Sequence, residues 1–166
     1  MVEREPRCAP AENGRVVVSR LLPGTDLLTG IEKICRNNRI SCGAVLSVVG
    51  SLAGATYQYV SRDPAEPSGV KYSEPKVVSR PVEFLSGQGL VGTEEDGSIC
   101  VHLHGVCIDD SGWVFGGHFG REGNPVLATV EVVLQELRGG QLTRRYDPET
   151  GFSLFQMEEP AGVGGE

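Results

Sequence analysis

The three histidines of this chain, His102, His104 and His118, all lie within the stretch VHLHGVCIDDSGWVFGGHFG, residues 101–120. Neutral imidazole nitrogens are common ligands of zinc and other late first-row divalent ions, and three protein ligands leave a coordination position open. Histidines also act as acid–base groups without a metal, or serve as hydrogen-bonded structural residues. The clustering favours a metal site and leaves the other two interpretations open.

Whether the three imidazoles converge depends on how the chain turns between them. In a β-strand, His102 and His104 are two residues apart and project from the same face. Residues 110–112 (DSG) fit a three-residue hairpin loop, in which Gly112 supplies the positive φ that the last position needs. This register predicts that His104 lies directly opposite His118, whereas a two-residue loop would place His118 on the other face.

The same register sets Gly105 opposite Gly117 and Val106 opposite Gly116, so side-chain bulk is missing beside the histidines. Such a gap either leaves room for a ligand, as a glycine-lined cleft, or marks a bulge or a close approach of the backbone. The sequence leaves both interpretations open.

Other groups are candidates for supporting a metal at this place. Cys100 falls on the same strand face as His102, and Glu83 and Glu131 offer carboxylates. Cys107 falls on the opposite face and is a poor candidate. If a bound metal activates water or polarises a carbonyl, Glu83 is the expected general base. No nucleophile elbow, phosphate-binding loop or dinucleotide fingerprint is found in the sequence.

The elements that must position these residues are expected to be short strands and one helix. The chain has 23 glycines between β-branched runs, which favours a compact, mostly antiparallel β domain. Residues 26–38 (DLLTGIEKICRNN) carry an apolar stripe at helical spacing, with Thr25 as the expected N-cap. Strands are expected over 14–22, 82–92, 98–108, 113–119 and 126–137, and an exposed loop over 62–76. Two more strands are expected within 42–61, joined around Gly50 and Ser51 by a tight hairpin or a bulged bend.

A length of 166 residues corresponds to one domain. We expect this domain to span residues 14–145, after a flexible segment of residues 1–13 and before a C-terminal tail of residues 146–166 that is disordered at its end. No apolar run approaches the length of a membrane-spanning helix, and the charged start lacks the apolar region of a secretory signal. Five cysteines without C-x-x-C spacing favour reduced thiols, so a cytoplasmic location is expected.

The net charge of −7 bears on partners. Non-specific binding to nucleic acid depends on Lys and Arg side chains that neutralise phosphates, and no stretch of this chain gathers them. The charge therefore disfavours nucleic acid as a partner.

Several segments resemble, in the same order, the plants-and-prokaryotes conserved (PPC) domain. These segments are RLLPGTDLLTGIEKICRNNRISCGAVLSVVGSLAGAT, VEFLSGQGLV, SICVHLHGVCIDDSGWVFGGHF and ATVEVVLQEL. The likeness runs from about Arg15 to Leu137, and its most specific pieces are LPGTDL, GSL, EF, HLHGV and GGHF.

This resemblance implies an α+β fold, with a helix packed on an antiparallel sheet, that assembles as a homotrimer. It also implies a divalent metal at His102, His104 and His118. Relatives of the stand-alone type often carry a DNA-binding label, taken from plant proteins in which an AT-hook precedes the domain, but the Arg-Gly-Arg-Pro core of that hook is missing here.

We therefore expect a cytoplasmic homotrimer with a three-histidine metal site, most simply zinc. Such a protein would bind a small molecule or support a metal-assisted reaction. The alternatives are a DNA-associated protein that acts without an AT-hook, and a purely structural assembly module.

Overall fold

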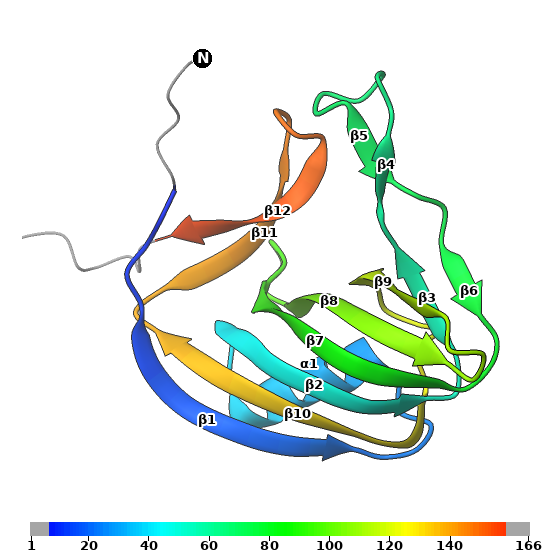
Figure 1. Ribbon diagram of the computed structural model, residues 1–166. Helices are drawn as coiled ribbons and strands as arrows, with labels where there is room; N and C mark the ends of the chain where they lie inside the picture. The colour runs from blue at the N-terminus through cyan, green and yellow to red at the C-terminus, as the bar shows by residue number, and fades with distance from the viewer. Residues whose placement is uncertain (1–6, 159–166) are drawn as a thin grey trace, which may run out of the picture.

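The computed structural model describes residues 7–158, which form a large, mostly antiparallel sheet with one helix against it (Figure 1). This arrangement confirms the expected α+β class. The elements are β1 (Glu12–Leu21), α1 (Leu27–Asn38), β2 (Gly43–Leu52), β3 (Ala55–Gln58), β4 (Val60–Arg62), β5 (Val70–Tyr72), β6 (Lys76–Val78), β7 (Val82–Thr93), β8 (Ile99–Asp109), β9 (Val114–Phe119), β10 (Val126–Arg138), β11 (Gln141–Asp147) and β12 (Phe152–Glu158). None of the described helices is long and apolar enough to span a membrane.

The main sheet has the strand order β1-β10-β2-β7-β8-β9-β3-β6. The pairs along this order are antiparallel, and β11 joins the sheet through a single parallel bridge between Thr143 and Thr93 of β7. The strands β8 and β9, which carry the three histidines, therefore lie well inside the sheet and are held by neighbours on both sides.

Helix α1 packs its apolar stripe onto one face of the sheet, with Leu27, Ile31 and Cys35 completely buried. It begins one residue later than predicted. Asp26 has an extended backbone and its carboxylate accepts a hydrogen bond from the Thr29 N–H at 3.2 Å, so Asp26 and not Thr25 is the N-cap.

The hydrophobic core lies between α1 and this face of the sheet. On β8 it takes Val101, Leu103 and Cys107, which alternate with the histidine positions. The rings of Phe84 and Phe119 meet edge to face in this core, with centroids 5.1 Å apart. Because one face of β8 is used for the core, the histidine side chains project from the other face.

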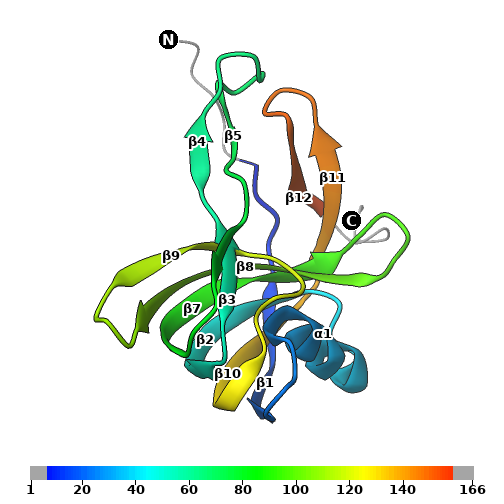
Figure 2. The same cartoon turned by 90° about the vertical axis from the view of Figure 1, so that its right-hand side faces the viewer.

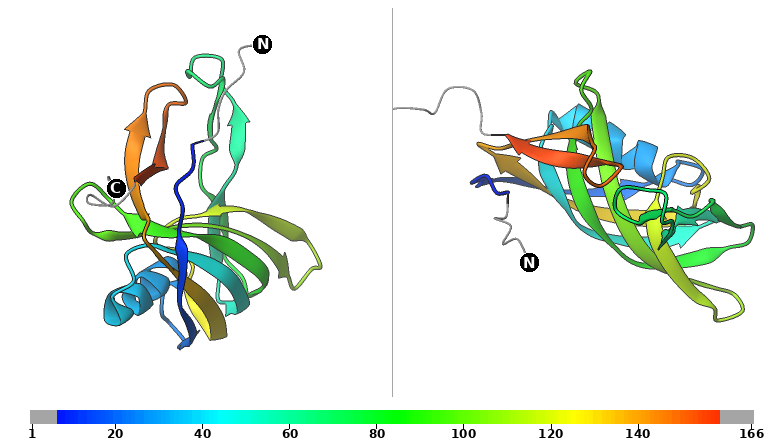
Figure 3. Two further views of the ribbon diagram at one scale, coloured as in Figure 1. Left: turned by 90° about the vertical axis from the view of Figure 1, so that its left-hand side faces the viewer. Right: turned by 90° about the horizontal axis from the view of Figure 1, so that it is seen from above.

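Two hairpins project from the sheet on that other side, away from α1 (Figure 2 and Figure 3). The first is β4–β5, which occupies part of the expected loop over 62–76. The second is β11–β12, which occupies residues that the sequence assigned largely to a tail. Residues 1–6 of the expected flexible segment and residues 159–166, where disorder was expected, lie outside the described part of the chain.

Of the two alternatives predicted at Gly50 and Ser51, the tight hairpin is wrong and the bulged bend is closer to the structure, because the two strands found within 42–61 join only at residues 53–54. Strand β2 continues through Gly50 as an irregularity in the register, with φ of 151°, and ends only at Leu52. A Cβ at position 50 would lie 2.2 Å from the Thr129 carbonyl oxygen, so glycine is needed here for a close approach of β10 and not for a turn.

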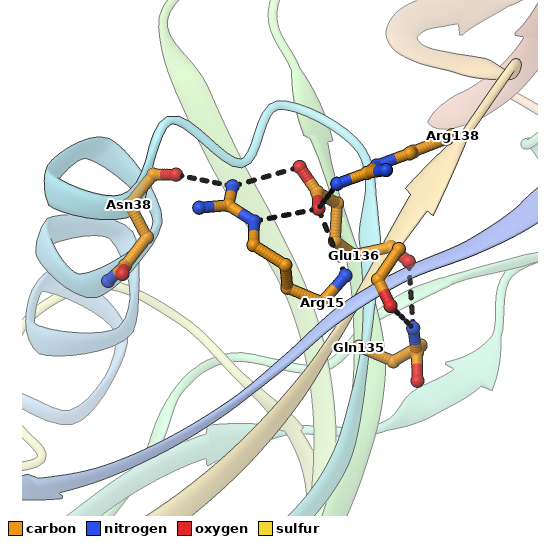
Figure 4. A network of polar contacts seen from close by, with 6 residues as sticks. Arg15, Asn38, Gln135, Glu136 and Arg138 are labelled. Atoms are coloured by element: carbon orange, nitrogen blue, oxygen red, sulfur yellow. Dashed lines mark hydrogen bonds and ion pairs between the residues drawn. The ribbon is translucent and has the colours of Figure 1, made fainter.

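The outer strand β1 is fastened to the end of β10 by a network of polar contacts (Figure 4). The Arg15 guanidinium donates to both carboxylate oxygens of Glu136, at 2.9 and 3.0 Å, and to the Asn38 carbonyl oxygen at the end of α1 at 2.8 Å. The hydrogen bonds from Arg15 lower the pKa of Glu136 to about 2. One guanidinium thus links a strand edge to the C-terminus of the helix.

Candidate metal centre

The β8–β9 hairpin has the register that the sequence predicted. His104 pairs with His118, and the chain reverses through a three-residue loop that ends at Gly112, with φ of 81°. The loop is stabilised by the carboxylate of Asp109, which accepts hydrogen bonds from the Ser111 N–H, the Ser111 hydroxyl and the Trp113 N–H. This loop length places His118 on the same face as the other two histidines.

The three imidazoles converge. One ring nitrogen from each lies within 4.8 Å of the others, and the ring centroids are 4.9 to 5.4 Å apart. The Nε2 atoms of His102 and His104 are 3.0 Å apart. Two nitrogens bound to one tetrahedral zinc at 2.0–2.1 Å would be about 3.3 Å apart, so a small opening of this pair accommodates an ion.

The hydrogen bonding of the rings also fits a bound ion. Within residues 7–158, the only hydrogen bond of His102 and His104 side chains joins the two rings, and the Nδ1 atom of His118 is buried with no partner. A buried polar atom without a partner costs free energy, and a metal or a ligand would remove that cost.

The protonation state favours metal binding as well. Burial, with smaller contributions from the other two imidazoles and Arg144, lowers the pKa of His118 to about 4. Burial also lowers the pKa of His102, with His104 and Arg144 as the next causes. These two rings are therefore neutral at pH 7, which is the form that binds metals.

Aromatic side chains from both hairpins lie over the histidines. The Tyr72 ring of β5 lies 4.9 Å from the His118 ring, and Phe155 of β12 lies 6.4 Å from His102. Phe152 packs on Tyr72 at 5.2 Å, so the two hairpins meet above the site. We call Tyr72, Phe152 and Phe155 the aromatic cover. None of the three was predicted from the sequence, because they are far from the histidines along the chain and belong to no motif.

Two cavities reach the histidines, together with a much narrower space under the aromatic cover that is lined by His102 and His118. The first, of about 340 Å³, is lined by Ser86, Gly87, Gln88, His104, Gly105, Val106 and Gly117. The second, of about 250 Å³, is bounded by polar side chains that include His118, Cys100, Glu94, Arg121 and Arg144. His104 and His118 therefore open onto different spaces.

The glycines beside the histidines are explained by close packing. A Cβ on Gly105 would lie 2.3 Å from the Phe84 ring, and one on Gly117 would lie 2.2 Å from the Gln58 carbonyl oxygen. The missing side chain of Gly105 thus makes room for a core residue. The first cavity is lined by glycines, as one interpretation predicted, but the packing interpretation accounts for why they are glycines.

The predicted supporting residues are not brought together with the histidines. Glu83 is exposed and pairs with Ile108, four residues beyond His104 on β8, a separation of about 13 Å along the strand. Glu131 lies on β10, three strand spacings or about 14 Å from β8.

Cys100 lies closer to the site, because it shares the second cavity with His118. Its Sγ atom does not belong to the group of donor atoms that lie within 4.8 Å of one another, however. Burial also raises the pKa of its thiol to about 12. At neutral pH this thiol is therefore protonated and is a poor metal ligand.

Comparison with known proteins adds to this geometry. A family model of the Plants and Prokaryotes Conserved (PCC) domain matches residues 9–138. A metal-containing protein from Archaeoglobus fulgidus shares 26% identity and a TM-score of 0.77, covering 91% of this chain and 99% of that one. A plant- and prokaryote-conserved protein from Pyrococcus horikoshii shares 25% identity and a TM-score of 0.76, covering 90% and 96%. Other solved structures with a DNA-binding label share 15% and 23% identity, which shows the fold alone.

A curated relative is much longer. The bifunctional protein GlmU of Synechococcus sp. (strain JA-3-3Ab) is 33% identical over 159 residues, which cover 94% of this chain and 22% of that protein. The chain thus spans about a fifth of the length of the curated relatives that it matches.

Proposed function

This chain belongs to the Plants and Prokaryotes Conserved domain family, and from that premise we propose that His102, His104 and His118 together bind one divalent metal ion, zinc in the first place. The observation that carries the proposal is the convergence of three imidazole nitrogens within 4.8 Å. The similar protein from Archaeoglobus fulgidus is called metal-containing, which supports the same reading.

A divalent ion held by three neutral imidazoles keeps an open position, at which it polarises a bound water or carbonyl. The residues of this chain set the conditions for that chemistry. Buried surroundings keep His118 unprotonated, and the aromatic cover shields His118 and His102 from bulk water, whereas His104 is exposed and leaves one side of the site open to solvent. The function is therefore binding of a small molecule at the metal, or a metal-assisted reaction on it. Glu83 as general base stays a prediction. Because Glu83 lies far from the histidines, it could act only on a substrate that extends from the metal along β7.

We further propose that the chain assembles as a homotrimer. The sheet face away from α1 exposes apolar side chains that alternate with core residues, and patches of this kind are typical of protein interfaces. They are 41–73% exposed and comprise Val16, Val18, Leu46, Val49, Leu85 and Val106. The number three is what the family resemblance implies, and light scattering of the purified protein tests it.

Elemental analysis of untagged protein tests the metal site. Wild type should retain about one metal ion per chain, and His104→Ala should be substoichiometric because one of three ligands is lost. Gln88→Ala is the matched control, since Gln88 pairs with His104 across β7 and β8 but offers no imidazole. Equal, substoichiometric metal in wild type and His104→Ala would refute the proposal. Trimers that contain no metal as purified and that survive a chelator would favour the structural module instead.

A further inference from the structure

Arg144 of β11 stands out among the residues around the histidines. It is a permanent cation that lines both the narrow space under the aromatic cover, with His102 and His118, and the second cavity of about 250 Å³. A fixed positive charge disfavours a divalent cation nearby, so its presence at a metal site needs an explanation.

The contacts of Arg144 leave its charge available. Among the described residues its ion pair is with Glu94, at 3.6 Å between Nη1 and Oε1, which is longer than a hydrogen bond. Both side chains are more than a third exposed, and such pairs contribute little. Arg121 in the same cavity differs, because it donates to Glu32 at 2.8 Å and to the Ile99 carbonyl oxygen at 3.2 Å.

The local charges indicate what the cavity accepts. Arg121 neutralises Glu32, and Glu94 offsets Arg144 across the longer contact. The three imidazoles contribute no negative charge, so a bound divalent ion would keep its full charge of +2 beside a guanidinium. An anion placed between them is attracted from both sides, and a planar guanidinium suits two-point binding of a carboxylate or a phosphate.

We infer that the metal at the three histidines takes a small oxyanion, a carboxylate or a phosphate, and that the Arg144 guanidinium holds it. This inference rests on the metal site proposed above. The second cavity, of about 250 Å³, has room for an anion of this size. The guanidinium replaces its weak contact to Glu94 by a contact to the anion.

Calorimetric titration of zinc-loaded protein with inorganic phosphate, and separately with acetate, tests the inference and distinguishes the two anions. Wild type should bind at least one of them, and Arg144→Gln should bind it about 10- to 100-fold more weakly because a charge-assisted contact is lost. Glu94→Gln should bind it more tightly, since the competing carboxylate is removed. Metal-free wild type should bind it at least about tenfold more weakly.

Arg145→Gln is the matched control. It removes the same charge from the next residue of β11, which lines neither the narrow space under the aromatic cover nor the second cavity. Its affinity for the anion should stay within about threefold of wild type. Arg144→Gln should retain its zinc, because a repulsive charge is removed; if it loses zinc, Arg144 supports the site's structure and the inference is wrong.

The two proposals fail in different ways. If wild type takes up no zinc, the metal site itself is refuted. If it takes up zinc but binds neither anion at millimolar concentration, or if Arg144→Gln and Arg145→Gln bind equally well, only the role of Arg144 is refuted.

Discussion

Replacing Gly105 with alanine should destabilise the fold by crowding the ring of Phe84. An added Cβ would lie 2.3 Å from Cζ of that ring, and ordinary contacts are 3.4 to 4 Å, so the ring must move by about 1 Å. It has little freedom to do so. Phe84 is fully buried against Phe119, and Gly87, opposite Gly105, lies so close that its own Cβ would meet the ring at 2.5 Å.

The expected cost follows from overpacking, which is about 1–3 kcal/mol for an extra methyl group in a filled core. Alanine also restricts the unfolded chain, which offsets up to about 1 kcal/mol. Gly120→Ala measures that offset alone, because a Cβ at position 120 meets no atom within 4 Å. We therefore expect Gly105→Ala to unfold with about 1–3 kcal/mol less free energy than Gly120→Ala.

Urea denaturation of the metal-free variants, followed by circular dichroism, measures this difference without the stabilisation that a bound ion would add. Adding Phe84→Leu to Gly105→Ala should recover part of the loss, because the smaller side chain leaves room for the methyl group. Equal midpoints for Gly105→Ala and Gly120→Ala would contradict this prediction, and so would additive effects of the Phe84 and Gly105 substitutions.

Further predictions concern the effect of pH, the reactivity of the cysteines, the loop between β8 and β9, and binding to DNA. Because the pKa of His118 is lowered to about 4, the ring signals of His118 in NMR spectra of the metal-free protein should stay constant between about pH 7.5 and about pH 6, and a titration of these signals near pH 6 would contradict this. The metal-free fold should lose stability as pH falls from about 6.5 towards 4, because the unfolded chain binds the proton more tightly. Of the five cysteines only Cys8 is exposed, so native protein should show one thiol that reacts quickly with a disulfide reagent. A second fast-reacting thiol would contradict this. Gly112→Ala should cost about 1–2 kcal/mol in urea denaturation, because the residue has φ of 81°, and an unchanged midpoint would contradict it. Because the net charge is −7, the protein should cause no gel shift of duplex DNA at physiological salt, and a clear shift would contradict this.

The central hairpin was predictable because its geometry is local. The spacing of His102 and His104, with a loop that ends in glycine, determines the register without information from elsewhere in the chain. Helix α1 was predictable for a similar reason, and its N-cap was misplaced by one residue because Thr25 and Asp26 are both capping types.

The rest of the site depends on contacts between distant segments. Tyr72 and Arg144 reach the histidines only through the packing of β5 and β11, and no local pattern marks either residue. The sequence could not decide between a hairpin and a bulged bend at Gly50, because a glycine at a bulge and a glycine at a turn look alike in sequence.

The hairpin β11–β12 has a particular place along the chain. The family model matches residues 9–138, and β11 begins only at Gln141. The histidines thus lie inside the segment that defines the family, whereas Arg144 and Phe155 lie beyond it. Substitutions in this hairpin can change which molecules reach the histidines while leaving the histidines in place. In this chain the placement of the histidines and the access to His102 and His118 are therefore determined by two different segments, the second of them about twenty residues long and at one end of the domain.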